Sequence, residues 1–134
     1  MPDVTAQAFR RRPTGYNSHM KITIWHNPRC SKSRTTLGLL LQHGFEPHIV
    51  EYLKTPPTAA EIGEVCRKLG IAPRQLLRTG EAEYKSLGLA DQKRNDAEIL
   101  AAMAANPVLI ERPVVIRDAR AALGRPPEAV LAIL

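Results

Sequence analysis

The 134-residue chain lacks most of the features that identify disulfide-stapled, metal-binding or membrane proteins. It has two cysteines, Cys30 and Cys66, which are too few for the disulfide framework of a small secreted domain. Its longest apolar runs, such as 129–134, are far shorter than the roughly 20 residues of a membrane-spanning helix. The four histidines and two cysteines show no zinc-ligand spacing. We therefore expect no disulfide scaffold, no membrane association and no metal site.

Aromatic residues are also scarce, at 4% of the chain, whereas 19 basic residues against 13 acidic ones give a formal net charge of +6. Most of the cations are arginine, and such a balance attracts anions in general. Nucleic acid is disfavoured as the partner because the chain has no long basic run and no nucleic-acid-binding motif. A small oxyanion is the ligand that we expect instead.

The first 20 residues differ from the rest of the chain. They show no apolar periodicity and contain Pro2, Pro13 and Gly15, so we predict a disordered extension or a segment introduced upstream of the native start. The apolar stretch and cleavage site of a secretory signal are not visible. We therefore expect a cytoplasmic protein with reduced thiols, whose single domain spans residues 21–134.

Apolar spacing, capping residues and Gly or Pro punctuation predict the order of the elements in this domain. Strands are predicted at 21–25, 48–52, 114–117 and 120–123. Helices are predicted at 31–43, 58–69, 73–77, 83–87, 96–105 and 126–133. This order predicts an α/β protein of the thioredoxin-like type. Its small mixed sheet would have one parallel βαβ crossover and an antiparallel hairpin, with a helical insertion between them.

The helix at 31–43 is expected to bury a stripe formed by Leu37, Leu40 and Leu41. Cys66 lies in the apolar stripe of the helix at 58–69, where a free cysteine acts as a small hydrophobic residue. We therefore predict that Cys66 is structural.

Cys30 lies between the first predicted strand and the following helix, in the sequence His-Asn-Pro-Arg-Cys-Ser-Lys-Ser-Arg. Free backbone N–H groups and the helix dipole stabilise negative charge at a helix start. Arg29, Lys32 and Arg34 add nearby cations. These effects favour the thiolate, which is the nucleophilic form of cysteine. We predict that Cys30 is reactive.

The residues after Cys30 exclude two familiar chemistries. Ser33 stands where a Cys-x-x-Cys motif has its second cysteine, so no disulfide can close within this turn. Thr36 stands where a phosphatase loop has its arginine. A single reactive thiol remains, and its chemistry calls for an outside reductant.

The motif around Cys30 resembles that of the glutaredoxin-dependent arsenate reductase family. Further matches occur in Leu76-Leu77-Arg78, Glu111-Arg112-Pro113 and Gly124-Arg125-Pro126-Pro127. The resemblance covers about residues 21–134, and the Cys-Ser-Lys-Ser sequence is similar to the shorter, chromosomally encoded branch of the family.

This resemblance implies a role for five residues. Cys30 would attack arsenic, and His26 would help to keep the thiol ionised. Arg78, Arg112 and Arg125 would hold the arsenate oxygens, a task that suits the planar guanidinium group. The Arg112-Pro113 bond would form the cis-proline turn of the fold.

The resemblance also implies a reaction. Arsenate would be reduced to arsenite through a thioarsenate intermediate on Cys30. Because the turn has no resolving cysteine, glutathione would attack next as a co-substrate, and glutaredoxin would resolve the mixed disulfide. No bound cofactor is implied.

Two other functions stay open at this point. A glutaredoxin-like monothiol oxidoreductase acting on glutathione mixed disulfides would also use Cys-x-x-Ser, but it would not need three arginines for one oxyanion. Redox-sensing transcription regulators of the same fold bind RNA polymerase. They usually carry Cys-x-x-Cys, against which Ser33 argues.

Overall fold

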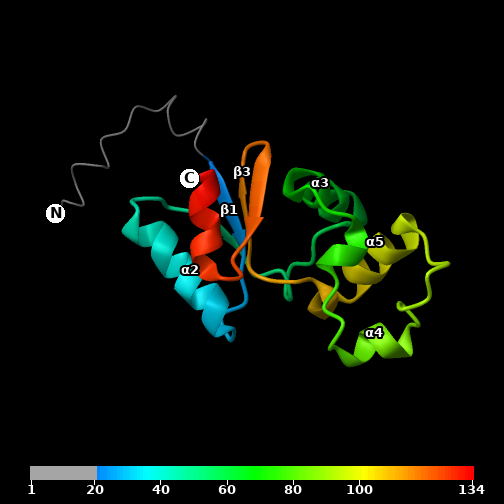
Figure 1. Cartoon of the computed structure of the whole chain (residues 1–134). Coiled ribbons are helices and arrows are strands. Elements are labelled where there is room, and N and C mark those ends of the chain that lie inside the picture. The colour runs from blue at the N-terminus through cyan, green and yellow to red at the C-terminus, as the bar shows by residue number, and fades with distance from the viewer. Residues whose placement is uncertain (1–20) are drawn as a thin grey trace.

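The computed structural model describes residues 21–134, so the predicted extension at residues 1–20 lies outside it. The strands are β1 (Ile22–Trp25), β2 (His48–Val50), β3 (Val114–Arg117) and β4 (Arg120–Leu123). The α-helices are α2 (Ser31–Gln42), α3 (Ala59–Leu69), α4 (Ala82–Ser86) and α5 (Asp96–Ala105) (Figure 1). Short 3₁₀ helices are η2 (Pro73–Leu76), η3 (Pro107–Leu109) and η4 (Pro127–Ile133).

The strands form one mixed sheet in the order β2-β1-β3-β4. The central residue Ile24 of β1 lies opposite Ile49 of the parallel strand β2 and opposite Val115 of the antiparallel strand β3. Strands β3 and β4 form an antiparallel hairpin. The predicted α/β order, with one parallel crossover through α2 and one hairpin, is confirmed.

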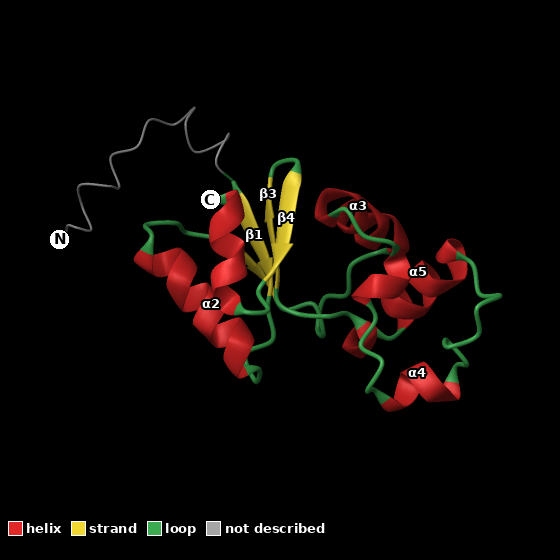
Figure 2. Cartoon of the chain, viewed as in Figure 1, coloured by secondary structure: helices red, strands yellow, loops and turns green. Residues whose placement is uncertain are grey.

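Helices cover both faces of the sheet, with α2 on one side and α3 and α5 on the other (Figure 2). One face packs Ile22, Ile24 and Val115 against Leu40 of α2 and Val130 of η4. On the other side, a larger apolar cluster joins the sheet to α3, α5 and the segments between them. Its buried members are Trp25, Tyr52, Ile62, Val65, Cys66, Leu76, Leu77, Leu89, Ile99, Met103, Leu109, Ile110 and Val114. The sheet therefore separates two hydrophobic cores.

Helix α3 follows its local sequence closely. The Thr58 hydroxyl accepts a hydrogen bond from the Glu61 N–H, and the Glu61 carboxylate accepts one from the Thr58 N–H. Gly70 ends the helix in the left-handed conformation, which costs glycine little because it lacks a Cβ atom. Cys66 is buried on this helix, as predicted.

The buried face of α2 differs from the prediction. Leu40 is buried, but Leu41 is 56% exposed. Ser33 and Thr36 are fully buried instead, because positions three and four apart share one face of a helix. The face that meets the rest of the protein is therefore partly polar, and this polar end lies beside Cys30.

Two predicted helices, at 73–77 and 126–133, are present as the 3₁₀ helices η2 and η4. The predicted strand at 48–52 ends at Val50. The chain then turns, with the Lys54 N–H donating to the Glu51 carbonyl. This early end places Tyr52 in a loop rather than in the sheet.

Candidate active site

Cys30 is the N-cap residue of α2, with extended backbone angles and no capping bond from its side chain. Its carbonyl accepts the Arg34 N–H at 3.0 Å. The thiol is free and partly exposed, and the first turn of α2 contains no acidic residue. The sulfur thus lies at the positive end of a helix, where negative charge is stabilised.

The loop before Cys30 is held by Ser33. The Ser33 Oγ lies 2.6 Å from His26 Nδ1 and accepts a 3.0 Å hydrogen bond from the Asn27 N–H. The Cys30 N–H donates to the Asn27 carbonyl at 3.0 Å. Ser33, which sequence analysis noted only for the cysteine it replaces, therefore shapes the turn that carries the thiol.

His26 is 6% exposed, and its ring contacts Ser33 through Nδ1. Burial lowers the pKa of His26; the Glu51 carboxylate opposes this shift and the Arg34 guanidinium adds to it. The imidazole is therefore neutral near pH 7. The structure places His26 where it orders the loop through Ser33, and the effect on the Cys30 thiol implied by the resemblance stays a prediction.

The backbone of Arg78 is hydrogen-bonded to the segment that precedes β3. The Arg78 N–H donates to the Leu109 carbonyl at 2.8 Å, and the Glu111 N–H donates to the Leu76 carbonyl at 2.9 Å. These two bonds flank an isolated antiparallel bridge between Leu77 and Ile110. Two segments that are distant in sequence are thus joined directly beside Arg112.

A carboxylate that sequence analysis missed brings the arginines together. The Glu111 Oε1 lies 3.5 Å from Arg78 Nε and 3.4 Å from Arg125 Nε. It also accepts the Arg112 N–H at 3.3 Å. Arg78 has a second partner in Glu81, at 2.6 Å from Nη1. The Arg78 and Arg125 side chains therefore meet at Glu111, and Arg112, the next residue in the chain, is bonded to it through its backbone N–H.

Some guanidinium nitrogens at this place have no partner. Arg112 Nε and Nη1 and Arg125 Nη1 are buried and lack a hydrogen-bond acceptor within the described part of the chain. Buried polar groups are nearly always hydrogen-bonded in proteins. Among the described residues, the unpaired N–H groups of Arg112 and Arg125 therefore indicate a site for an acceptor-rich anion.

Tyr52 interacts electrostatically with both Cys30 and Arg78. It is 1% exposed, and burial raises its pKa far above the usual value. The Arg78 charge opposes this increase in the Tyr52 pKa, and electrostatic interactions with Cys30, Glu111 and Glu81 add to it. The hydroxyl therefore keeps its proton at neutral pH and can donate it in a hydrogen bond.

The turn that carries Arg125 packs tightly against α2. The Gly124 N–H donates to the Pro113 carbonyl at 2.9 Å. A Cβ atom on Gly124 would lie 2.5 Å from Thr36 Oγ1 and 2.7 Å from Pro113 Cγ, so only glycine fits. The Arg112-Pro113 bond is cis, as the resemblance implied, and the Arg125-Pro126 bond is also cis. Arg125 is therefore held beside the helix that begins at Cys30.

The chain matches the ArsC family over residues 25–133. It belongs to the ArsC family. The uncharacterized protein YfgD of Escherichia coli (strain K12) is 47% identical over 115 residues, which cover 85% of this chain and 97% of YfgD. The arsenate reductase of Haemophilus influenzae is 46% identical over 116 residues, which cover 86% of this chain and all of that protein.

A solved structure of an arsenate reductase from Vibrio cholerae superposes with a TM-score of 0.84 at 46% identity. It covers 86% of this chain and 98% of its own. The predicted thioredoxin-like α/β fold is confirmed by this likeness. The range that matches the ArsC family includes Cys30 and all three predicted arginines.

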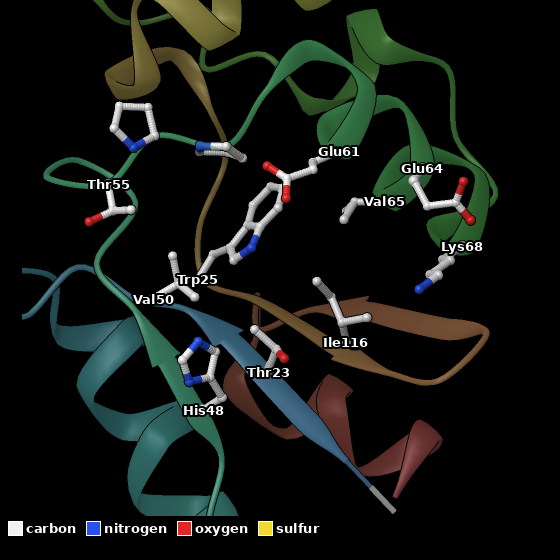
Figure 3. Close-up of a pocket in the computed structure, with 12 residues that line it drawn as sticks. Thr23, Trp25, His48, Val50, Thr55, Glu61, Glu64, Val65, Lys68 and Ile116 are labelled. Atoms are coloured by element: carbon white, nitrogen blue, oxygen red, sulfur yellow. The ribbon is translucent and has the colours of Figure 1, made fainter. Parts of the chain in front are cut away.

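Two of the hollows formed by the described residues lie close to the first two strands of the sheet. One of about 240 Å³ lies at the loop that precedes Cys30, between residues 26–29 and Glu51, Leu53 and Lys54. A larger one, of about 450 Å³, lies between the sheet and α3, where Trp25, His48 and Glu61 line it (Figure 3). The larger hollow is lined by neither cysteine nor arginine, so it is separate from the candidate active site.

Residues 21–134 contain no group of three or more His, Cys, Asp or Glu side chains arranged to hold a metal ion. Within the same range, no helix is both long enough and apolar enough to cross a membrane.

Proposed function

We propose that this protein reduces arsenate to arsenite, with Cys30 as the nucleophile and with glutathione and glutaredoxin as the source of electrons. The observation that carries the proposal is a free thiol at a helix start together with buried guanidinium N–H groups that lack acceptors. Relatives that bear the name arsenate reductase support it, since the whole length of one of them matches 86% of this chain.

In the proposed complex, the arsenate oxygens accept hydrogen bonds from Arg112 and Arg125, whose free N–H groups need acceptors. Arginine suits a tetrahedral oxyanion because its rigid fork gives paired, charge-assisted hydrogen bonds. Arg78 adds positive charge, and neutral Tyr52 adds a further donor. These groups offset the repulsion between an anionic substrate and the Cys30 thiolate.

In the first step, the Cys30 thiolate attacks As(V). One arsenate oxygen leaves as water, and a bond between sulfur and arsenic forms. A second thiol must then supply the remaining electrons. Ser33 cannot do so, and Cys66 is buried on α3, where burial raises its pKa, with Asp96 adding to the shift and Arg67 opposing it.

Glutathione therefore completes the reduction. Its thiolate attacks the Cys30 sulfur, the S–As bond breaks, and arsenic leaves with the electron pair as arsenite. Two thiols have then been oxidised to one mixed disulfide while As(V) becomes As(III). Glutaredoxin reduces the mixed disulfide and returns Cys30 to its starting state.

The 240 Å³ hollow beside the nucleophile has suitable charges for glutathione. Arg29 and Lys54 can pair with the two carboxylates of this tripeptide, and Glu51 can pair with its ammonium group. The hollow lies next to Cys30 along the chain, which would bring the incoming thiol close to the sulfur that it attacks.

A coupled assay tests the proposal. Arsenate-dependent loss of NADPH is followed in the presence of glutathione, glutaredoxin and glutathione reductase. We expect turnover by the natural protein and by Cys66→Ala, and none by Cys30→Ser. Turnover of glutathione mixed disulfides without any turnover of arsenate would instead identify a monothiol oxidoreductase.

A further inference from the structure

Glu111 has an unexpected position for an acidic residue, because it lies inside the cluster of arginines. Its carboxylate contacts Arg78 Nε, Arg125 Nε and the Arg112 N–H, and each contact is made through Oε1. Its side chain is 26% exposed, close to the values for the two arginines that it contacts. A negative charge within a site for an anion weakens the attraction for that anion, so its presence needs a physical reason.

The reason is that arginine side chains brought close together need a negative partner to hold them in place. The guanidinium groups of Arg78 and Arg125 come from separate segments and repel one another, and each long side chain has many rotamers to choose from. Glu111 takes the Nε edge of Arg78 and of Arg125. The free nitrogen of Arg125 is Nη1, so pairing through Nε leaves this N–H available.

The backbone reinforces this arrangement. The Glu111 N–H is bonded to the Leu76 carbonyl, and the Arg78 N–H is bonded to the Leu109 carbonyl. The carboxylate therefore starts from a fixed point between the segment of Arg78 and the cis bond before Pro113. A carboxylate held in this way can fix two flexible side chains at once.

We propose that Glu111 is a positioning residue for the oxyanion, which holds Arg78 and Arg125 in the orientation that the bound anion requires. This inference rests on the proposed function, since it assigns a role within the same site. Preorganised donors bind an anion more tightly because less side-chain freedom is lost on binding. Glu111 thus weakens the electrostatic attraction for the anion but fixes the orientation of the two arginine side chains.

Two substitutions separate geometry from charge. In Glu111→Gln, an amide oxygen can take the place of Oε1 and accept the same hydrogen bonds without the charge. Glu111→Ala removes both the acceptor and the charge. Glu64→Ala is the matched control, because Glu64 forms an exposed pair with Arg67 on α3, away from Cys30.

For Glu111→Ala, kcat/KM for arsenate should fall about ten- to a hundredfold, mainly through KM, as when charged hydrogen bonds are lost. Glu111→Gln should remain within about threefold of the natural protein, since neutral hydrogen bonds are weaker but keep the geometry. Glu64→Ala should not change either constant.

A second readout does not require turnover. Inorganic phosphate, which has the shape of arsenate, should protect Cys30 from alkylation by iodoacetamide, as measured by mass spectrometry of the Cys30 peptide. Protection should need about tenfold more phosphate in Glu111→Ala than in the natural protein. Reaction of Cys30 with the neutral bis(2-hydroxyethyl) disulfide, which does not use the arginines, should be unchanged.

The outcomes that overturn the inference are distinct. Equal losses in Glu111→Gln and Glu111→Ala would show that charge alone matters, and tighter arsenate or phosphate binding in either would show that Glu111 only repels the anion. A slower reaction with the neutral disulfide in Glu111→Ala would show a general structural role. If the natural protein binds phosphate but never reduces arsenate, the proposed function fails, while the phosphate measurements still decide the role of Glu111.

Discussion

The two cysteines lie in opposite environments, Cys30 in a partly exposed turn and Cys66 in the buried face of a helix. Cys30 is partly exposed as the N-cap of α2, next in sequence to Arg29 and close in sequence to Lys32. Cys66 is 2% exposed in the middle of α3, where Ile62 and Val65 share its apolar cluster. Both thiols are free. The two free thiols thus differ in exposure because of their places in the fold, and we expect their reactivities to differ for the same reason.

Substitution of each cysteine in turn tests this comparison, and the loss of arsenate turnover in the Cys30 variant is the largest effect that we expect. Cys30→Ser should lower arsenate turnover by about a thousandfold or more, because the attacking atom is lost. Cys66→Ala should keep the turnover within about twofold, at a cost in stability from the small cavity. Coupled NADPH oxidation and thermal unfolding of both variants check these values. Similar losses of turnover would mean that Cys66 takes part in the reaction.

The same comparison can be made between an arginine of the candidate site, Arg112, and an exposed arginine of α3, Arg67. Arg112→Ala should lower kcat/KM for arsenate about a hundredfold, since two charged donors to the oxyanion are lost. The melting temperature should stay the same or rise, because Arg112 Nε and Nη1 are buried without acceptors. Arg67→Ala, on the exposed face of α3, should leave kcat/KM unchanged. A melting temperature several degrees lower in Arg112→Ala would show that Arg112 has structural partners.

Glycine substitutions test how tightly the site is packed. Gly124→Ala should lower arsenate turnover about tenfold and destabilise the fold by about 1–3 kcal/mol, because the new Cβ would displace the turn of Arg125. Gly38→Ala is the control, since a Cβ there meets nothing within 4 Å on α2. It should stabilise the protein by about 0.5–1 kcal/mol. Urea unfolding measures both values, and an unchanged Gly124→Ala would remove the packing argument.

The smallest expected effect is a dependence of stability on pH. Burial raises the pKa of Cys66 in the folded protein, so above about pH 8.5 the unfolded thiol ionises first. The unfolded state then binds fewer protons than the folded state, and the free energy of unfolding falls as the pH rises. Cys66→Ala should flatten the curve between pH 8 and 10. The same slope in the natural protein and the variant would assign the dependence to other groups.

Signals between neighbouring residues predicted much of the fold. Thr58 with Glu61 and Asn95 with Glu98 form the capping boxes at the expected helix starts, because an N-cap and its partner are three residues apart. The position of Cys30 between β1 and α2 was predicted from the strand pattern before it and the helical pattern after it. Hydrophobic spacing was less reliable on α2, since Leu41 is exposed while Ser33 and Thr36 are buried.

The partners of the arginines could not be predicted in this way. Glu81 and Glu111 pair with Arg78, yet in the sequence they look like ordinary surface acids. Tyr52 was assigned to a strand, although it lies in the loop after β2 with its hydroxyl near the charges of Cys30 and Arg78. These roles depend on which distant segments meet.

Local sequence signals were enough to fix the order of the elements and to place a free cysteine at a helix start. Both follow from interactions over a few residues, such as capping, turn chemistry and the orphan N–H groups of a first turn. Only the tertiary structure decided which carboxylate pairs with which arginine, and which N–H groups stay free for a substrate. Charge interactions depend on distance and burial, and for residues far apart in the chain both quantities exist only once the sheet and its two cores have assembled.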